Sequence, residues 1–161
     1  MIREAEIGDI PAIVAMGERF HAASGYADLA AFDPLSAART FDRLISSPDG
    51  VILVWEEAGE IAGTAAALLF PFFFNARHRH GQEFFWWCDP ACRGRAGPAL
   101  LAALEEWARD NGAQSLALAT LASMRPHAVG KLYQRAGYRA SDATYVKGLN
   151  GADRNHSSNS R

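Results

Sequence analysis

The sequence is poor in the features that mark secreted, zinc-binding and membrane proteins. It has only two cysteines, Cys88 and Cys92, which are too few for a disulfide framework and lack the second pair of a structural zinc site. Its longest apolar run, residues 64–74, is too short to span a bilayer and contains Pro71. The N-terminal stretch MIREAEIGDIP lacks the basic and then apolar pattern of a signal peptide. We therefore expect a cytoplasmic protein that does not enter the membrane.

An excess of charge of either sign is also lacking. The chain has 16 Lys and Arg against 18 Asp and Glu, a formal net charge of −2, so no general attraction for nucleic acid or an anionic membrane is expected. No Lys-Ser or Lys-Thr follows the glycines of residues 94–97, which argues against a P-loop for nucleoside triphosphates. No G-x-G-x-x-G opens the first strand and helix, which argues against a dinucleotide fold. Any anion site must therefore be local.

The sequence does contain alternating strand and helix patterns over residues 1–149. Its 161 residues, 49% of them apolar, suffice for one domain with a single core. The apolar periodicity predicts elements in the order β-α-α-β-β-β-α-β-α-β, an α/β domain with a mixed sheet. The expected strands are residues 2–6, 51–57, 61–70, 83–88, 115–120 and 143–149, and the expected helices are residues 10–20, 34–45, 98–110 and a helix ending at 136–137. The polar tail, residues 150–161, has no apolar face to bury and is expected to be disordered.

Residues 88–108, CDPACRGRAGPALLAALEEWA, combine a tight turn with an amphipathic helix. A strand that ends at Cys88, followed by a loop and a helix that starts near Pro98, would direct free backbone N–H groups at one point and form an anion site. Small residues leave the backbone accessible, and arginines add charge and donors. The small residues are Gly94, Ala96 and Gly97, and the arginines are Arg93 and Arg95. The pattern indicates a phosphate or diphosphate site, although a glycine-rich turn that stands alone before a helix is more often an ordinary turn.

The same stretch resembles the GNAT superfamily of N-acetyltransferases, particularly its smaller phage- and prophage-type members. In that family a hydrophobic-Asp-Pro step after the fourth strand is followed by an Arg/Gln-x-x-Gly-x-Gly/Ala loop and an amphipathic helix. The matching residues here are Cys88-Asp89-Pro90, residues 93–99 and LLAALEEWA. LYQRAGY, residues 132–138, resembles the family's Leu-Tyr-x-x-x-Gly-Phe/Tyr signature, and TYVKGL resembles its closing strand. The resemblance implies a mainly antiparallel central sheet with helices on both faces.

The resemblance also implies acetyl-coenzyme A as co-substrate and no metal. The diphosphate would lie in the loop, and the pantetheine arm would lie beside the end of the fourth strand. The cofactor-binding residues so implied are Trp87, Cys88, Arg93, Gly94, Arg95, Ala96, Gly97, Pro98 and Ala99. The loop is one residue shorter than the family pattern and Pro98 removes an N–H donor, so we expect the arginine side chains to contribute more of the binding. An Asn that the family often places about seven residues before the signature Tyr is replaced by Pro126, with Ser123 or His127 as substitutes.

Acetyl transfer to an amine needs a base, because a primary amine is protonated at neutral pH. The family signature implies Tyr133 as the acid that protonates the leaving thiolate, with a core tyrosine as the alternative role. For the base we predict Glu83, which resembles a Glu that family members use on this strand; a solvated strand-end Glu and a base acting through water are the alternatives. Glu83 is one residue off the usual spacing from Cys88, so a bulge is required to place the carboxylate on the correct face.

Two further clusters have a simpler interpretation. His78 and His80 would share one strand face, but no third metal ligand is evident nearby in the sequence, so a basic turn is favoured over a metal site. No His or acid is placed by its spacing to activate Cys88 as a nucleophile. A core thiol at the end of a strand is therefore the favoured role for Cys88.

The aromatic residues of 71–74 and 84–87 exceed what one strand face needs. One set could line an acceptor groove, and plain core packing is an equal alternative. With residues 20–26, which border the acceptor site in the family, the predicted substrate residues are Phe20, Tyr26 and Phe73. We therefore predict an acetyl-coenzyme A-dependent N-acetyltransferase that transfers the acetyl group directly to an amine of a small molecule or peptide. The alternative is a non-catalytic acyl-coenzyme A-binding or interaction module. A homodimer is compatible with the sequence, and no nucleic-acid or membrane partner is expected.

Overall fold

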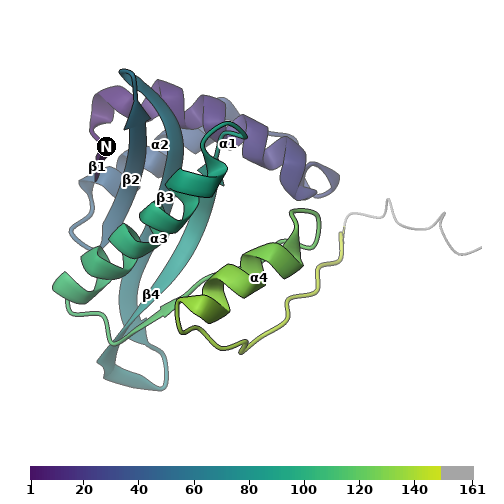
Figure 1. The fold of residues 1–161 in the computed structure, drawn as a ribbon. Helices are drawn as coiled ribbons and strands as arrows, with labels where there is room; N and C mark the ends of the chain where they lie inside the picture. Colours follow the sequence, from purple (N-terminus) through teal and green to yellow (C-terminus); the bar gives the residue numbers. More distant parts are fainter. Residues whose placement is uncertain (150–161) are drawn as a thin grey trace, which may run out of the picture.

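The computed structural model describes residues 1–149, which form a five-stranded sheet covered by helices (Figure 1). The strands lie in the order β1-β2-β3-β4-β5; neighbours from β1 to β4 pair antiparallel, and β5 pairs parallel to β4. The strands are β1 (Ile2–Glu4), β2 (Gly50–Glu57), β3 (Glu60–Phe72), β4 (Asn75–Cys88) and β5 (Ser115–Ala117). The helices are α1 (Ile10–Ser24), α2 (Pro34–Ser46), α3 (Arg93–Asp110) and α4 (Pro126–Arg135), with short 3-10 helices η1 (Ile7–Asp9) and η2 (Tyr26–Asp28).

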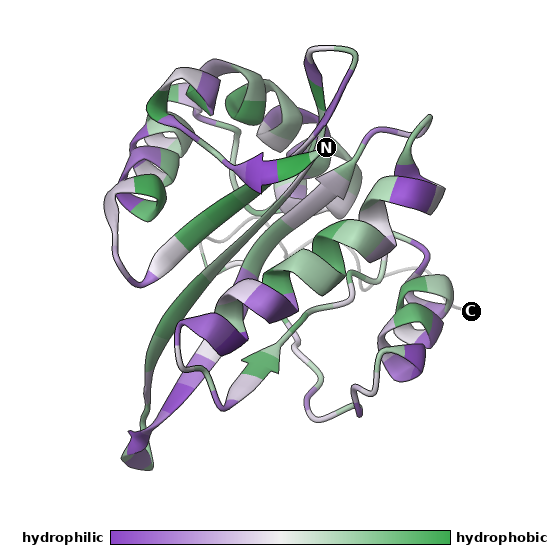
Figure 2. Cartoon of the chain, turned by 60° about the vertical axis from the view of Figure 1, so that its left-hand side comes forward, coloured by the Kyte–Doolittle hydropathy of each residue, from purple (hydrophilic) through white to green (hydrophobic). Residues whose placement is uncertain are grey.

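The helices form two layers, one on each face of the sheet (Figure 1). α1 and α2 pack on one face, and α3 packs on the other. Strand alternation divides the side chains of β2 between these layers: Ile52 and Val54 face α1 and α2, whereas Val51 and Leu53 face α3. Figure 2 shows that hydrophobic residues concentrate along the central strands. The sheet therefore contributes to the core of both layers.

Local sequence determines where the first two helices end and begin. α1 ends at Gly25, which has a left-handed φ of 81° that glycine adopts without strain. α2 begins after Asp33, whose side chain accepts a hydrogen bond from Leu35 N at 3.0 Å, and Pro34 occupies the first helical position. These signals fix both ends of the connection that carries η2, which borders an apolar cavity described below.

The predicted α/β domain, with a mixed sheet and helices on both faces, is confirmed. The start of α3 differs from the prediction, because the helix begins at Arg93 and not near Pro98. The N–H groups of Arg95 and Ala96 both donate to the carbonyl of Cys92, at 2.9 and 2.8 Å, so the turn after β4 is already helical. The glycine- and arginine-rich stretch is therefore the first turns of α3 and not a separate loop.

The predicted closing strand, residues 143–149, is wrong, since the described chain forms no strand after β5. Strand-forming residues make a strand only where a neighbouring edge pairs with them. Here Tyr145, Val146 and Leu149 are 93%, 72% and 87% exposed. β5 is also shorter than predicted, because its pairing with β4 ends at Ala117.

Two expectations concern the chain as a whole. The tail that we expected to be disordered, residues 150–161, lies outside the described residues. Within residues 1–149, no helix combines the length and the apolar character that crossing a bilayer demands.

Candidate active site

The sheet opens between its two parallel strands, β4 and β5. These strands pair at three positions, the first joining His80 to Ser115 and the last joining Gln82 to Ala117. Beyond that point β4 continues to Cys88, whereas the chain after β5 leaves the sheet. On this side, the backbone of β4 past Gln82 has no partner strand within the described chain. The result is a gap between β4 and β5.

A β-bulge in β4 turns Glu83 to the α3 side of the sheet. Phe85 pairs with Ala66 of β3. Glu83 pairs with Ala67, so Phe84 is an additional residue in β4. Ala66 packs in the layer of α1 and α2, and Ala67 packs in the layer of α3. Because paired residues share a face, Glu83 points to the α3 side although Phe85 points to the other. This is the bulge that the spacing of Glu83 required.

Glu83 and Tyr133 meet at the backbone of Ala119, which follows β5 across the gap. Glu83 Oε2 accepts a hydrogen bond from Ala119 N at 3.2 Å. The Tyr133 hydroxyl donates to Ala119 O at 3.0 Å. The Tyr133 ring is buried and stacks on Trp86, with a centroid distance of 5.8 Å and an interplanar angle of 29°. The two predicted catalytic side chains, from β4 and α4, therefore come together around one residue.

Burial gives both side chains unusual protonation behaviour. Desolvation raises the pKa of Glu83 to about 7, and the N–H of Ala119 opposes this shift. Burial, followed by the charge of Glu83, raises the pKa of Tyr133 well above its ordinary value. Glu83 thus changes charge near neutral pH, as a general base requires, and Tyr133 remains a protonated donor across that range.

The N-terminal turns of α3 hold the small residues of the predicted cradle. A Cβ placed on Gly94 would meet nothing within 4 Å, so the backbone at this position is open to a ligand. Ala96 and Gly97 are buried, and a Cβ on Gly97 would lie 3.3 Å from the Trp86 ring. These two residues let α3 approach the sheet closely. Pro98, the next residue, is exposed.

Both arginines of the predicted cradle contact the protein itself. Arg93 Nε donates to Cys88 O at 2.9 Å, and its guanidinium lies 4.9 Å from the centroid of the Trp87 ring. Arg95 makes two hydrogen bonds to the carboxylate of Glu57, at 2.8 and 3.2 Å. An anion would therefore have to compete with Glu57 for Arg95. Arg93 uses only Nε in its hydrogen bond, so its two terminal nitrogens have no hydrogen-bond partner among residues 1–149 and can bind a ligand.

An apolar cavity of about 270 Å³ lies among α1, α2 and β4, on the face of the sheet opposite α3. Phe20 and Tyr26, two of the predicted substrate residues, line it together with Phe84 of the bulge. Phe73, the third predicted substrate residue, does not line this cavity. It is 78% exposed in the turn between β3 and β4, and aromatic composition alone does not show where a hairpin turns.

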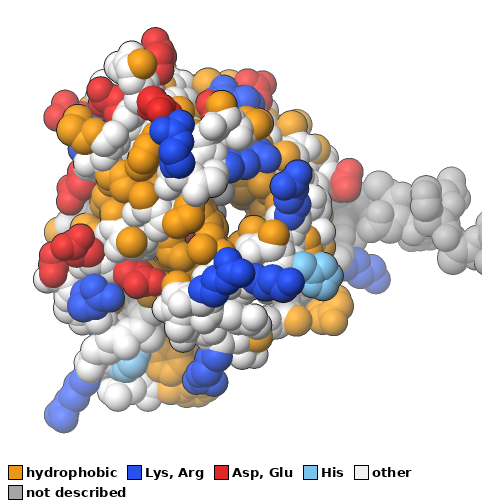
Figure 3. Space-filling view, in the orientation of Figure 1, with side chains coloured by type: hydrophobic (Ala, Val, Ile, Leu, Met, Phe, Trp, Pro, Cys, Tyr) orange, Lys and Arg blue, Asp and Glu red, His pale blue; other side chains and the backbone are white. Residues whose placement is uncertain are grey.

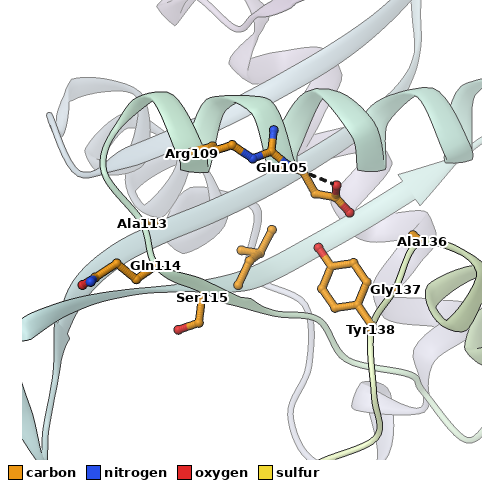
Figure 4. Close-up of a pocket in the computed structure, with 9 residues that line it drawn as sticks. Glu105, Arg109, Ala113, Gln114, Ser115, Ala136, Gly137 and Tyr138 are labelled. Atoms are coloured by element: carbon orange, nitrogen blue, oxygen red, sulfur yellow. Dashed lines mark ion pairs between the residues drawn. The ribbon is translucent and has the colours of Figure 1, made fainter.

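A second cavity, of about 250 Å³, lies beside the C-terminal half of α3 (Figure 4). Glu105 and Tyr138 line it, and Arg109 pairs with Glu105 at 3.6 Å. Burial raises the pKa of Tyr138 above its ordinary value, with Glu105 adding to the shift. Neither Glu83 nor Tyr133 lines this cavity, but the ring of Tyr138 lies 5.8 Å from the ring of Tyr133, so the cavity adjoins the candidate reaction centre.

His78 and His80 lie in β4, not in the expected basic turn, and both contact Ser115 of β5. His78 Nε2 and His80 Nδ1 lie 2.7 and 2.8 Å from the Ser115 hydroxyl oxygen. Among residues 1–149, no three His, Cys, Asp or Glu side chains cluster as metal ligands would. Cys88 and Cys92 are buried free thiols, and desolvation raises the pKa of Cys88 to about 12, which disfavours a nucleophilic thiolate there.

Three residues of the site were not found from the sequence. Ala119 acts through its backbone, so its side chain gives no signal. Glu57 is far from Arg95 in the chain, and only the fold brings the two together. Phe84 did have a signal, since the spacing between Glu83 and Cys88 demanded an extra residue in this strand.

Three similar solved structures are named as acetyltransferases. A predicted acetyltransferase from Clostridium acetobutylicum, solved with acetyl-coenzyme A, is 21% identical over 92% of this chain and 96% of its own, with a TM-score of 0.73. A ribosomal-protein-alanine N-acetyltransferase from Brucella melitensis biovar Abortus 2308 is 19% identical over 91% and 98%, with a TM-score of 0.69. An aminoglycoside acetyltransferase from an uncultured soil metagenomic sample is 18% identical over 92% and 97%, with a TM-score of 0.70. The fold is therefore that of an acetyltransferase.

Sequence comparison identifies the family. The model of the acetyltransferase (GNAT) family matches residues 19–138, which include β4, α3 and Tyr133. The chain therefore belongs to the GNAT family of acetyltransferases. Comparison with curated protein sequences finds no match.

Proposed function

We propose that the protein is an acetyl-coenzyme A-dependent N-acetyltransferase that transfers the acetyl group directly to an amine. The observation that carries this proposal is the meeting of Glu83 and Tyr133 at Ala119, beside the gap between β4 and β5. One side chain can accept a proton near neutral pH and the other can donate one. Such a pair is what acyl transfer from a thioester to an amine needs.

The residues around the gap fit the acyl donor of this family. Past Gln82, the free edge of β4 near Trp87 and Cys88 offers backbone groups that can pair with the amides of a pantetheine arm. The first turn of α3 offers the backbone at Gly94 and the guanidinium of Arg93 to a diphosphate. Figure 3 shows a hollow in the surface between α3 and α4 with Lys and Arg side chains near it. Acetyl-coenzyme A, when bound, supplies the thioester whose acetyl group is transferred.

The side chains of the site have separate roles in the proposed chemistry. A Glu83 carboxylate oxygen would accept the proton that the amine nitrogen must lose before it can attack. The Tyr133 hydroxyl would turn its single proton from Ala119 O to the sulfur as the thiolate leaves. A phenol with a raised pKa is a weak acid, so we expect its hydrogen bond to the thiolate to contribute more than complete proton transfer.

An amine acceptor is supported by two considerations. Glu83 is a half-buried carboxyl group with a pKa raised to about 7. A role as base for an ammonium group would explain such a group, whereas a non-catalytic binding module has no need of it. One structural neighbour is also named as an N-acetyltransferase of ribosomal-protein alanine.

We further propose that the protein is cytoplasmic and belongs to the small phage- and prophage-type branch of the family. Its acceptor would be a small molecule or a peptide, and we expect no nucleic-acid or membrane partner. We also propose a homodimer, which a mass measurement in solution would test.

The test is release of coenzyme A thiol from acetyl-coenzyme A with a panel of amines. We expect saturable release, and we expect Tyr133→Phe to lose turnover while acetyl-coenzyme A still raises its melting temperature. A non-catalytic acyl-coenzyme A-binding module would be stabilised equally but would release no thiol with any amine. An interaction protein that only keeps the fold would show no stabilisation.

A further inference from the structure

We propose that the acceptor is a primary amine whose other end is an uncharged apolar group of the size of an aromatic ring. This group would bind in the apolar cavity among α1, α2 and β4, which we call the aromatic cavity. The inference rests on the proposed acetyl transfer and names its substrate class. Four features of the cavity carry it: its lining, its size, its position at the part of β4 that borders the gap, and a glycine that keeps it open.

The lining of the aromatic cavity is mainly apolar, and His21 is its one titratable side chain apart from Tyr26 among the described residues. None of the described residues that line it is Asp, Glu, Lys or Arg. The wall consists mainly of six aromatic side chains, which are Phe20, Tyr26, Phe32, Phe41, Phe84 and Phe85. A second ammonium group, as in a polyamine or an aminoglycoside, would find no carboxylate in this lining, and burying an unpaired charge is strongly unfavourable. The lining therefore selects against polycationic acceptors.

The aromatic wall is ordered and large enough for a ring. Phe85 packs edge-to-face on Phe20 at a centroid distance of 5.0 Å and stacks with Phe41 at 5.9 Å. The cavity volume is about 270 Å³, and an apolar cavity of about 150 Å³ is known to hold benzene. Phe84 and Tyr26 are 54% and 42% exposed, so the cavity opens to solvent between them. A ring with a short aminoalkyl arm matches this volume and opening.

The cavity lies at the same stretch of β4 as the reaction centre, on the opposite face of the sheet. Phe84 and Phe85 line the cavity and follow Glu83 directly in β4. The bulge at Phe84 sends the Glu83 side chain to the α3 side, where it reaches Ala119 across the gap. A ring held in the cavity would therefore bring its amine to the carboxylate on an arm that passes the edge of β4 through the gap, where β4 has no partner strand on that side within residues 1–149.

Gly17 of α1 keeps the aromatic cavity open. It lines the cavity, and a Cβ at this position would approach the Phe41 ring to 3.5 Å and the Phe32 ring to 3.7 Å, which are ordinary contact distances. A longer side chain at position 17 would therefore occupy the space proposed for the substrate. Gly17 does not have a left-handed φ, so a side chain there causes little backbone strain. Gly17→Leu is the decisive variant, and Gly17→Ala is a milder one. Ala15→Leu adds the same side chain on the exposed side of α1 and is the control.

The experiment measures thiol release with 2-phenylethylamine, ethylamine, spermidine and kanamycin for the wild type and the three variants. We expect kcat/KM of the wild type for 2-phenylethylamine to exceed that for each other amine by about tenfold or more. Gly17→Leu should lower kcat/KM for 2-phenylethylamine by about tenfold or more, leave ethylamine nearly unchanged, and bind acetyl-coenzyme A normally. Gly17→Ala should cause a smaller loss of the same selectivity, and Ala15→Leu should behave as wild type.

Higher kcat/KM for ethylamine, spermidine or kanamycin than for 2-phenylethylamine would overturn the substrate class while leaving the proposed function intact. An equal loss for all amines in both Gly17 variants would also overturn it. Absence of thiol release with every amine would refute the proposed function instead. In that case calorimetric titration of 2-phenylethylamine into the coenzyme A-loaded protein tests separately whether the aromatic cavity binds the amine. Binding to the wild type that Gly17→Leu abolishes would support the proposed site. No binding to the wild type would overturn it.

Discussion

Replacing Glu83 by Gln tests whether the half-buried carboxyl group beside Ala119 is desolvated enough to shift its pKa. Gln has nearly the same shape and can still accept the hydrogen bond from Ala119 N, but it cannot ionise. The folded protein raises the pKa of Glu83 from 4.5 to about 7, so between these values the folded state holds a proton that the unfolded state has lost. Stability of the wild type must therefore fall as pH rises through this window.

The magnitude follows from the size of that shift. At about 1.4 kcal/mol per pH unit, the wild type loses about 3 kcal/mol of unfolding free energy between pH 4.5 and pH 7 from this group. Glu83→Gln loses none of it. The melting temperature of the variant should thus exceed that of the wild type at pH 8 by about 6 to 12 °C, and the two should converge below pH 4.5.

Thermal unfolding of both proteins from pH 4 to pH 8, without acetyl-coenzyme A, measures this difference. Glu106→Gln, on the exposed side of α3, is the matched control and should change stability by no more than about 0.5 kcal/mol at any pH. Parallel curves for the wild type and Glu83→Gln would refute the reasoning, because they would mean that Glu83 is solvated in the folded protein. In catalysis, kcat/KM of the wild type should rise with pH through about 7, and Glu83→Gln should lose that rise together with about a hundredfold or more of the rate.

Three further predictions concern the donor, the cradle and the core. Tyr133→Phe should keep the ring stack on Trp86 and the cofactor-induced rise in melting temperature, but it should lower kcat by about tenfold or more; unchanged kcat would assign Tyr133 to the core. Arg93→Ala should weaken stabilisation by acetyl-coenzyme A more than Arg95→Ala does, because Glu57 already holds Arg95; the opposite order in a thermal-shift titration would contradict this arrangement of the cradle. Leu100→Ala should cost about 2 to 5 kcal/mol in urea unfolding, since Leu100 is fully buried between α3 and the sheet; a cost below about 1 kcal/mol would not fit this packing.

Much of the fold could be predicted from local patterns. The helical spacing of apolar residues and the three strand-like runs joined by turns predicted the α/β class, and the family resemblance predicted helices on both faces. The boundary of α3 was misplaced because proline at position 98 suggested a helix start, whereas Cys92 O accepts the first helical bonds several residues earlier. The closing strand was wrong because pairing partners decide whether a β-rich run becomes a strand.

The candidate site shows the same division. The sequence by itself determined the residue types: an acid on the fourth strand, a tyrosine in the signature helix, and small and basic residues at the start of α3. Only the tertiary structure decided that a bulge at Phe84 sends Glu83 to the α3 side and that Ala119 joins it to Tyr133. The physical reason is that strand register and desolvation depend on neighbours distant in the chain, so neither the face of a carboxylate nor its pKa can be read from adjacent residues.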